Sequence, residues 1–142
     1  MNIIDWFLSP EKSKNIGFED VLHAIKHPTD YLIINTLSPS EQSCLISTTI
    51  QIDKEEQEIN SLLNQYLPLK KQIIIYGKHA CDPSVDQKQK QLLSLGFHAY
   101  VYRGGLFEWL LLQEIYGSLE FPTENTSTGR IDILKYKPQP TI

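Results

Sequence analysis

The chain has 142 residues, of which 41% are hydrophobic and 21% charged, and this is the composition of one globular domain with a continuous core. Its net charge of -4 at pH 7 argues against a surface that neutralises phosphates, so nucleic acid is not an expected partner. No apolar run is long enough to span a membrane and the N-terminus does not resemble a secretory signal, so we expect a soluble, cytoplasmic protein.

Four short apolar runs predict β-strands. Residues 31–34 and residues 72–76 are rich in isoleucine and are bounded by polar or turn-forming residues, as buried parallel strands are. Residues 97–102 predict a third strand, and residues 48–52 predict a shorter fourth one. We expect these four strands, centred on Ile33, Ile50, Ile74 and Tyr100, to form one sheet.

Helical periodicity fills the intervals between the strands. The expected helices cover residues 18–25, a segment entered at Asp53 and stopped at Pro68 with its apolar repeat at residues 59–66, residues 83–95 and residues 106–116. Asp53 and Glu56 have the spacing of a capping box before the second helix, and Asp82-Pro83 is a strong start signal for the third. Because strands and helices alternate, the fold class is α/β, with a central mostly parallel sheet flanked by helices. The loop from Gly77 to Asp82 should lie at the carboxyl end of a strand.

Both ends of the chain carry apolar residues outside this alternating pattern. The N-terminal cluster contains Trp6 and Phe7, and the C-terminal segment contains Ile133 and Tyr136, while residues 124–129 predict a surface loop. Each end can pack on its own domain or on a partner. We expect at least one of them to take part in a contact with another protein or with a second copy.

The segment between Ile73 and Trp109 resembles the rhodanese family. It contains an apolar strand ending in Tyr76, a six-residue loop, a helix, another strand, and then the run Gly104-Gly105-Leu106-Phe107-Glu108-Trp109. The resemblance covers about residues 16–117, so residues 1–142 are expected to be a single domain with an N-terminal apolar segment (1–15) and a C-terminal extension (118–142). More narrowly, the sequence resembles a divergent branch of rhodanese-like proteins of protists and large DNA viruses.

The resemblance implies that Gly77 stands at the position of the family's catalytic cysteine. A glycine can neither accept sulfur nor attack a phosphate, so the chain is expected to be an inactive relative in which Gly77 permits a tight turn. Where the family has an aspartate and often an arginine after an earlier strand, this sequence has Asn35 and Leu37. The charged pair is therefore also missing.

Cys81 is the alternative nucleophile. It precedes the expected helix start, where free N–H groups and nearby Lys78 and His79 would lower a thiol pKa, whereas Asp82 and Asp86 would oppose ionisation. Under this alternative the protein is a sulfurtransferase or a redox carrier that uses Cys81. Cys44 and Cys81 are expected to be free thiols.

Other chemistry is less well supported by the sequence. The related dual-specificity phosphatases place an arginine six residues after the cysteine, but this chain has Pro83 counted from Gly77 and Gln87 counted from Cys81. His79 and Cys81 lack the spacing of a zinc site, and His23 and His27 are expected to be solvated, so we predict no metal and no cofactor.

Arg103 has two interpretations: it reaches over the mouth of the loop, or it caps the adjacent turn at the surface. The loop residues Gly77, Lys78 and His79, together with Arg103, Trp6 and Phe7, are the candidate binding residues. The sequence therefore favours a non-catalytic module that binds another protein, either as a regulatory adaptor in the cytoplasm or as a minor structural component of a virus particle.

Overall fold

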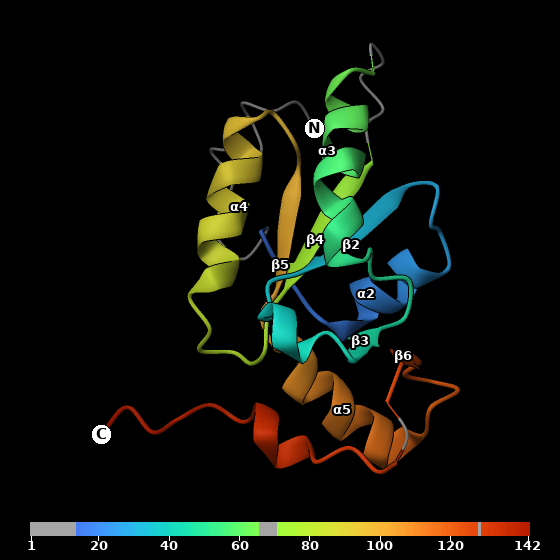
Figure 1. The fold of residues 1–142 in the computed structure, drawn as a ribbon, viewed down its shortest axis with the longest axis vertical. Coiled ribbons are helices and arrows are strands. Elements are labelled where there is room, and N and C mark those ends of the chain that lie inside the picture. The colour runs from blue at the N-terminus through green and yellow to red at the C-terminus, as the bar shows by residue number, and fades with distance from the viewer. Residues whose placement is uncertain (1–13, 66–70, 128) are drawn as a thin grey trace.

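The computed structural model describes residues 14–65, 71–127 and 129–142, and its centre is a parallel sheet with strand order β1-β5-β4-β2 (Figure 1). The strands are β1 (Asn15–Ile16), β2 (Tyr31–Asn35), β4 (Gln72–Tyr76) and β5 (Ala99–Tyr102). β4 pairs in parallel with β2 on one side, where Ile33 of β2 lies opposite Ile74 of β4. On its other side β4 pairs in parallel with β5, where Ile74 lies opposite Tyr100. The expected α/β fold with a central parallel sheet is confirmed.

Helices cover both faces of this sheet. They are α2 (Phe18–Ile25), α3 (Glu55–Leu63), α4 (Ser84–Ser94) and α5 (Gly105–Tyr116). Successive side chains of a strand point to opposite faces, so Ile73 and Ile75 of β4 pack with α3 and α4 while Ile74 and Tyr76 pack with α2 and α5. The sheet is buried on both sides, which explains why its strands read as continuous apolar runs.

A second, two-stranded sheet lies beside the first. It pairs β3 (Cys44–Ile46) with β6 (Thr123–Asn125) in antiparallel fashion. The buried hydroxyl of Tyr76 joins the two sheets, because it accepts a hydrogen bond from the Ile46 N–H at 3.1 Å and shares another with the Thr49 hydroxyl at 2.8 Å. Both partners lie on only one face of β4, so this hydroxyl distinguishes the two sides of the sheet.

The predicted strand at residues 48–52 is wrong. Thr49 makes one isolated bridge to Ile33, but Thr48 has a positive φ of 66° and a 3₁₀ turn, η3 (Ile52–Lys54), begins immediately afterwards. The chain therefore cannot stay extended there. The fourth strand of the sheet is β1, and β2 lies at the other end of the strand order.

Several predicted boundaries also need correction. α3 begins after Lys54 without a side-chain cap, so Asp53 and Glu56 do not form the expected capping box. The predicted surface loop at residues 124–129 begins within β6, and the strand predicted from residue 97 begins at Ala99. The remaining 3₁₀ turns are η2 (Pro39–Glu41) and η4 (Ile133–Tyr136).

The C-terminal segment packs on its own domain. The side chain of Tyr136 is 1% exposed and joins the core cluster beneath α5, with Ile131 and Ile133 packed against the same cluster. Within the described part of the chain, no helix has the length and the apolar composition that crossing a bilayer requires.

Candidate functional site

The loop between β4 and α4 lies at the carboxyl ends of the parallel strands, close to the start of α5 (Figure 1). β4 ends at Tyr76, whose carbonyl accepts a hydrogen bond from the Thr36 N–H at 3.0 Å, and α4 begins at Ser84. The loop therefore lies beside the end of β2. This edge of a parallel sheet is where ligands bind in related architectures.

The carboxylate of Asp82 fills the inside of this loop. It accepts hydrogen bonds from the Lys78 N–H at 3.2 Å, the Ser84 N–H at 3.0 Å and the Ser84 hydroxyl at 2.6 Å. Burial alone raises the pKa of Asp82, but the hydrogen bonds from Ser84 and Lys78 outweigh it, so the pKa lies below its usual value. The loop therefore holds an anion that belongs to the chain itself.

Gly77 has no room for a side chain. A Cβ at this position would lie 2.7 Å from Asp82 Oδ2, 2.9 Å from Val85 Cγ1 and 3.0 Å from Thr36 Oγ1. Gly77 is not one of the glycines with positive φ, so the crowding around its missing side chain, and not a left-handed backbone, is what favours glycine here. Its side-chain space is occupied.

The N-terminus of α5 binds the backbone of the loop. The N–H of Leu106 donates to the Gly77 carbonyl and the N–H of Phe107 donates to the Lys78 carbonyl, both at 2.9 Å. Gly105 makes this approach possible, because it has a φ of +70° and its Cβ would lie 2.9 Å from the Gly77 carbonyl oxygen and from the His79 nitrogen. The Gly104-Gly105 pair is part of the run that resembles the rhodanese family, but its steric role cannot be predicted from the sequence.

The cations around the loop have partners. Lys78 Nζ lies 2.8 Å from Glu41 Oε2, and the hydrogen bonds of Glu41 with Lys78 and with Ser38 lower the pKa of this carboxyl. Arg103 donates to both carboxylate oxygens of Asp86, at 3.1 and 2.8 Å, and to the Asn15 side chain at 3.2 Å. Arg103 therefore joins α4 and β1 at the surface.

The two thiols differ in environment. Cys44 is buried, which raises its pKa, and Cys81 is exposed, and both are free. The N–H of Cys81 donates to the ring Nδ1 of His79 at 3.1 Å, so this nitrogen accepts a hydrogen bond from the backbone of the loop. The loop therefore brings together Gly77, Lys78, His79 and Cys81, as their sequence positions require.

Other residues singled out by the sequence have structural roles. Asn35 is buried and forms a two-way amide pair with Gln42, with distances of 3.0 and 2.8 Å. Trp109 is fully buried and its indole N–H donates to the Pro122 carbonyl at 3.1 Å, which agrees with its interpretation as a core anchor. Trp6 and Phe7 lie outside the described residues.

Histidine ligands do not gather into a metal centre. His23 and His27 are both exposed and stack with their ring centroids 4.2 Å apart, and His27 Nδ1 lies 2.8 Å from the His23 carbonyl. Among residues 14–65, 71–127 and 129–142, no three His, Cys, Asp or Glu side chains form a group that could hold a metal ion.

An open cleft of about 360 Å³ lies beside the loop. Thr36, which follows β2, and Ser84, the first residue of α4, line this cleft, and their hydroxyls are joined by a hydrogen bond of 2.7 Å. Lys88 and Glu55, which also line the cleft, form an ion pair at 2.7 Å. The cleft is thus lined by side chains that already bind one another.

Comparisons with known proteins agree with the fold of the chain. Residues 18–112 match the sequence model of the rhodanese-like domain. A full-length protein from Lactobacillus plantarum has a similar structure, with a TM-score of 0.61, 21% identity, and coverage of 87% of this chain and 93% of that one. A Bacillus halodurans protein has a TM-score of 0.59 at 19% identity, and the similarity covers 82% of this chain and 80% of that one. An Anabaena protein has a TM-score of 0.54 at 23% identity, with coverage of 78% of this chain and 91% of that one. A search of curated protein sequences finds no match.

Proposed function

Because the chain belongs to the rhodanese-like domain family, we propose that it is a catalytically inactive member that works by binding another protein or a second copy of itself. Members of this family are often sulfurtransferases, and the chemistry needs a cysteine thiolate at the end of the strand that precedes the loop. In this chain Gly77 follows that strand directly. In this proposal the loop keeps the family's backbone shape but lacks the cysteine that sulfur transfer requires.

The occupied space at Gly77 is the observation that carries this proposal. A cysteine at the same backbone position would place its Cβ within 3.0 Å of atoms of Asp82, Val85 and Thr36. The Asp82 carboxylate takes up the Lys78 N–H, one of the donors that would otherwise face an anionic sulfur. The surroundings of Gly77 therefore favour a carboxylate that stabilises the loop over a site for sulfane sulfur.

The paired cations support the same proposal. Stabilising a transferring phosphoryl group needs a cationic clamp that points at the substrate. Lys78 pairs with Glu41 and Arg103 pairs with Asp86, and the positions that would supply a phosphatase arginine are Pro83 and Gln87. Phosphatase activity is therefore less well supported than sulfur transfer.

Cys81 remains the basis of the alternative function. It is the exposed thiol of the loop, and it lies three residues before α4 begins at Ser84. A sulfurtransferase or redox carrier that uses Cys81 would form a persulfide or mixed disulfide there. The lowered pKa of the neighbouring Asp82 keeps a negative charge next to Cys81 in the chain.

Turnover of thiosulfate with cyanide as the sulfur acceptor tests the proposal. We expect no thiocyanate above the background without protein, from the wild-type chain and from Cys81→Ser alike. Intact-mass measurement after incubation with thiosulfate should show no adduct of about 32 Da, the mass of one sulfur atom. Thiocyanate production that disappears in Cys81→Ser and persists in Cys44→Ser would establish a sulfurtransferase that uses Cys81. It would contradict the proposal that the protein is catalytically inactive.

The proposal also states that the protein binds another protein or a second copy of itself, either as a regulatory adaptor in the cytoplasm or as a component of a virus particle. A self-associating chain should show a concentration-dependent mass in sedimentation equilibrium. If the chain is a component of a virus particle, its peptides should be found in purified virus particles after mild detergent washing. A monomer at all concentrations that captures no defined partner would leave no support for a binding function.

A further inference from the structure

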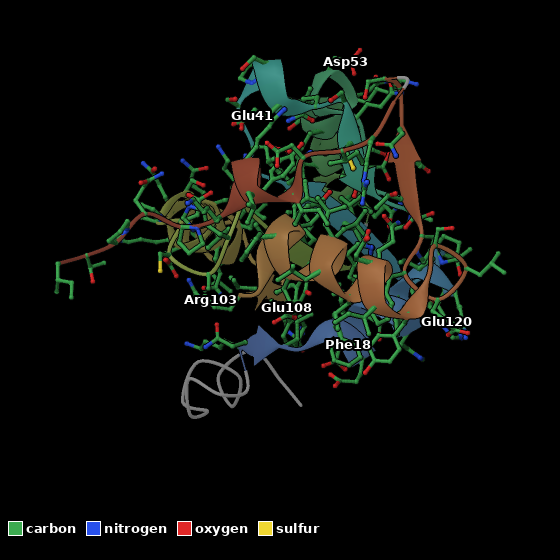
Figure 2. The ribbon with its side chains drawn as sticks, turned by 90° about the horizontal axis from the view of Figure 1, so that it is seen from below. Phe18, Glu41, Asp53, Arg103, Glu108 and Glu120 are labelled. Carbon is green, nitrogen blue, oxygen red and sulfur yellow. The ribbon has the colours of Figure 1, made fainter. Side chains whose placement is uncertain are left out.

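An apolar groove lies between α2 and α5, away from the loop. Its volume is about 520 Å³, within the range of about 300 to 1,000 Å³ that small-ligand sites have. Its lining consists of Phe18, Leu22, Leu112, Tyr116, Glu120 and Phe121. Figure 2 shows Phe18 of α2 and Glu120, which follows α5, at the same end of the molecule. Glu120 is the one charged residue of the lining.

The floor of the groove is formed by packed aromatic side chains, and its rim is exposed to solvent. Phe121 is 5% exposed and packs edge-on against Phe18, with ring centroids 5.5 Å apart, while the Tyr116 ring lies 5.9 Å from Phe121 and is 63% exposed. An aromatic side chain that enters would therefore meet ring faces and edges on several sides. Such a surface binds apolar or aromatic groups rather than ions.

We propose that the occupant of this groove is the N-terminal apolar segment of the same chain, residues 3–8. Five of these six residues are apolar, namely Ile3, Ile4, Trp6, Phe7 and Leu8. This inference does not depend on whether the loop at Gly77 is catalytic. It assigns Trp6 and Phe7 to an intramolecular contact.

The length of the chain permits this contact. The described structure begins at Lys14, whose carbonyl is fixed at the sheet edge by the Val101 N–H at 2.9 Å. Phe18 follows four residues later, so its Cα lies at most about 15 Å from that of Lys14. The six steps from Leu8 to Lys14 can span about 20 Å. Residues 3–8 can therefore reach the groove without any change in the described fold.

Tethering favours the chain's own segment over that of a second copy. A short linker gives an effective concentration of about 1 mM. An intrinsic Kd of about 0.1 mM would then keep the groove occupied about nine-tenths of the time. At micromolar protein, the same segment on another copy would be roughly a thousandfold more dilute.

Fluorine NMR of the full chain labelled with 5-fluorotryptophan tests the contact. The chain has two tryptophans, so Trp6→Phe assigns the Trp6 signal and leaves that of the buried Trp109. We expect a dispersed Trp6 signal that is protected from acrylamide in the wild type. Tyr116→Glu should move it to the shift and accessibility of the denatured chain, because it places a carboxylate on the groove rim.

Ile115→Glu is the matched control. Ile115 is 70% exposed and lies next to Tyr116 on α5 but does not line the groove, so this variant should leave the Trp6 signal unchanged. Since both positions are exposed, both variants should fold, and the Trp109 signal checks this. A Trp6 signal that is solvent-exposed in the wild type overturns the proposal. So does a protected signal that Tyr116→Glu leaves unchanged, or one whose protection rises with protein concentration, which would indicate a second copy as the occupant.

Discussion

Gly77→Ala tests whether the space beside the loop is really filled. The new Cβ would lie 2.7 Å from Asp82 Oδ2 and 2.9 Å from Val85 Cγ1, closer than real Cβ contacts come. Overpacking of this kind costs about 1 to 3 kcal/mol, and the reduced freedom of the unfolded chain returns about 0.4 to 1 kcal/mol. With both terms at the middle of their ranges, about 2 and about 0.7 kcal/mol, Gly77→Ala should lower the free energy of unfolding by about 1.3 kcal/mol. This corresponds to a melting temperature lower by about 3 to 5 °C.

A double-mutant cycle identifies the carboxylate as the obstacle. Asp82→Ala removes the nearest atom, so Gly77→Ala should cost less in that background, as measured by urea unfolding. Asp86→Ala is the matched control, because that carboxylate belongs to the first turn of α4 but binds Arg103 instead. In the Asp86→Ala background the cost should equal that in the wild type. A Gly77→Ala chain as stable as the wild type, or an equal cost in all three backgrounds, would refute the reasoning.

Three further predictions concern the loop and the core. Gly105→Ala should lower the free energy of unfolding by about 2 to 5 kcal/mol, because Gly105 has a positive φ of +70° and a Cβ there would contact backbone atoms that cannot move aside. A loss in urea unfolding smaller than that of Gly77→Ala would contradict this prediction. Trp109→Ala should cost about 3 to 5 kcal/mol, since the indole is fully buried and hydrogen-bonded, and calorimetry of the folded variant would measure it. Asp82 has a lowered pKa when folded, so its contribution is complete above the ordinary pKa of about 3.9 and disappears as the pH falls through the lower folded value. Asp82→Asn should therefore be less stable than the wild type at neutral pH and should show a smaller loss on acidification, and an unchanged acid dependence would argue against the loop contacts.

The sheet could be predicted because its strands are buried on both faces. The runs at Ile33 and Ile74 are continuous apolar segments for that reason, and they pair as expected. β1 has only two residues, too few for any periodicity to appear in the sequence. The segment at residues 48–52 alternates like a strand, but the positive φ of Thr48 ends it, and nothing in the local sequence indicates that conformation.

The position of the loop could be predicted, but its contents could not. The strand before Gly77 and the helix start at Asp82-Pro83 mark its limits, and the structure agrees. That the Asp82 carboxylate turns inward depends on the placement of Ser84 and Thr36 around it. The pairing of Lys78 with Glu41 joins segments far apart in the sequence, so it follows from the fold and not from any motif.

The hydroxyl of Tyr76 has a consequence for the alignment of the sheet. β4 reads Ile73-Ile74-Ile75 before Tyr76, so a shift by one residue would exchange isoleucine for isoleucine at two of these three positions. Apolar burial at those two positions does not distinguish the two alignments. In the shifted one the Tyr76 hydroxyl would turn away from Ile46 and Thr49, and an unsatisfied buried hydroxyl costs about 1 to 3 kcal/mol. One oxygen atom thus adds to the preference for the observed pairing of a strand whose isoleucines alone would not fix it.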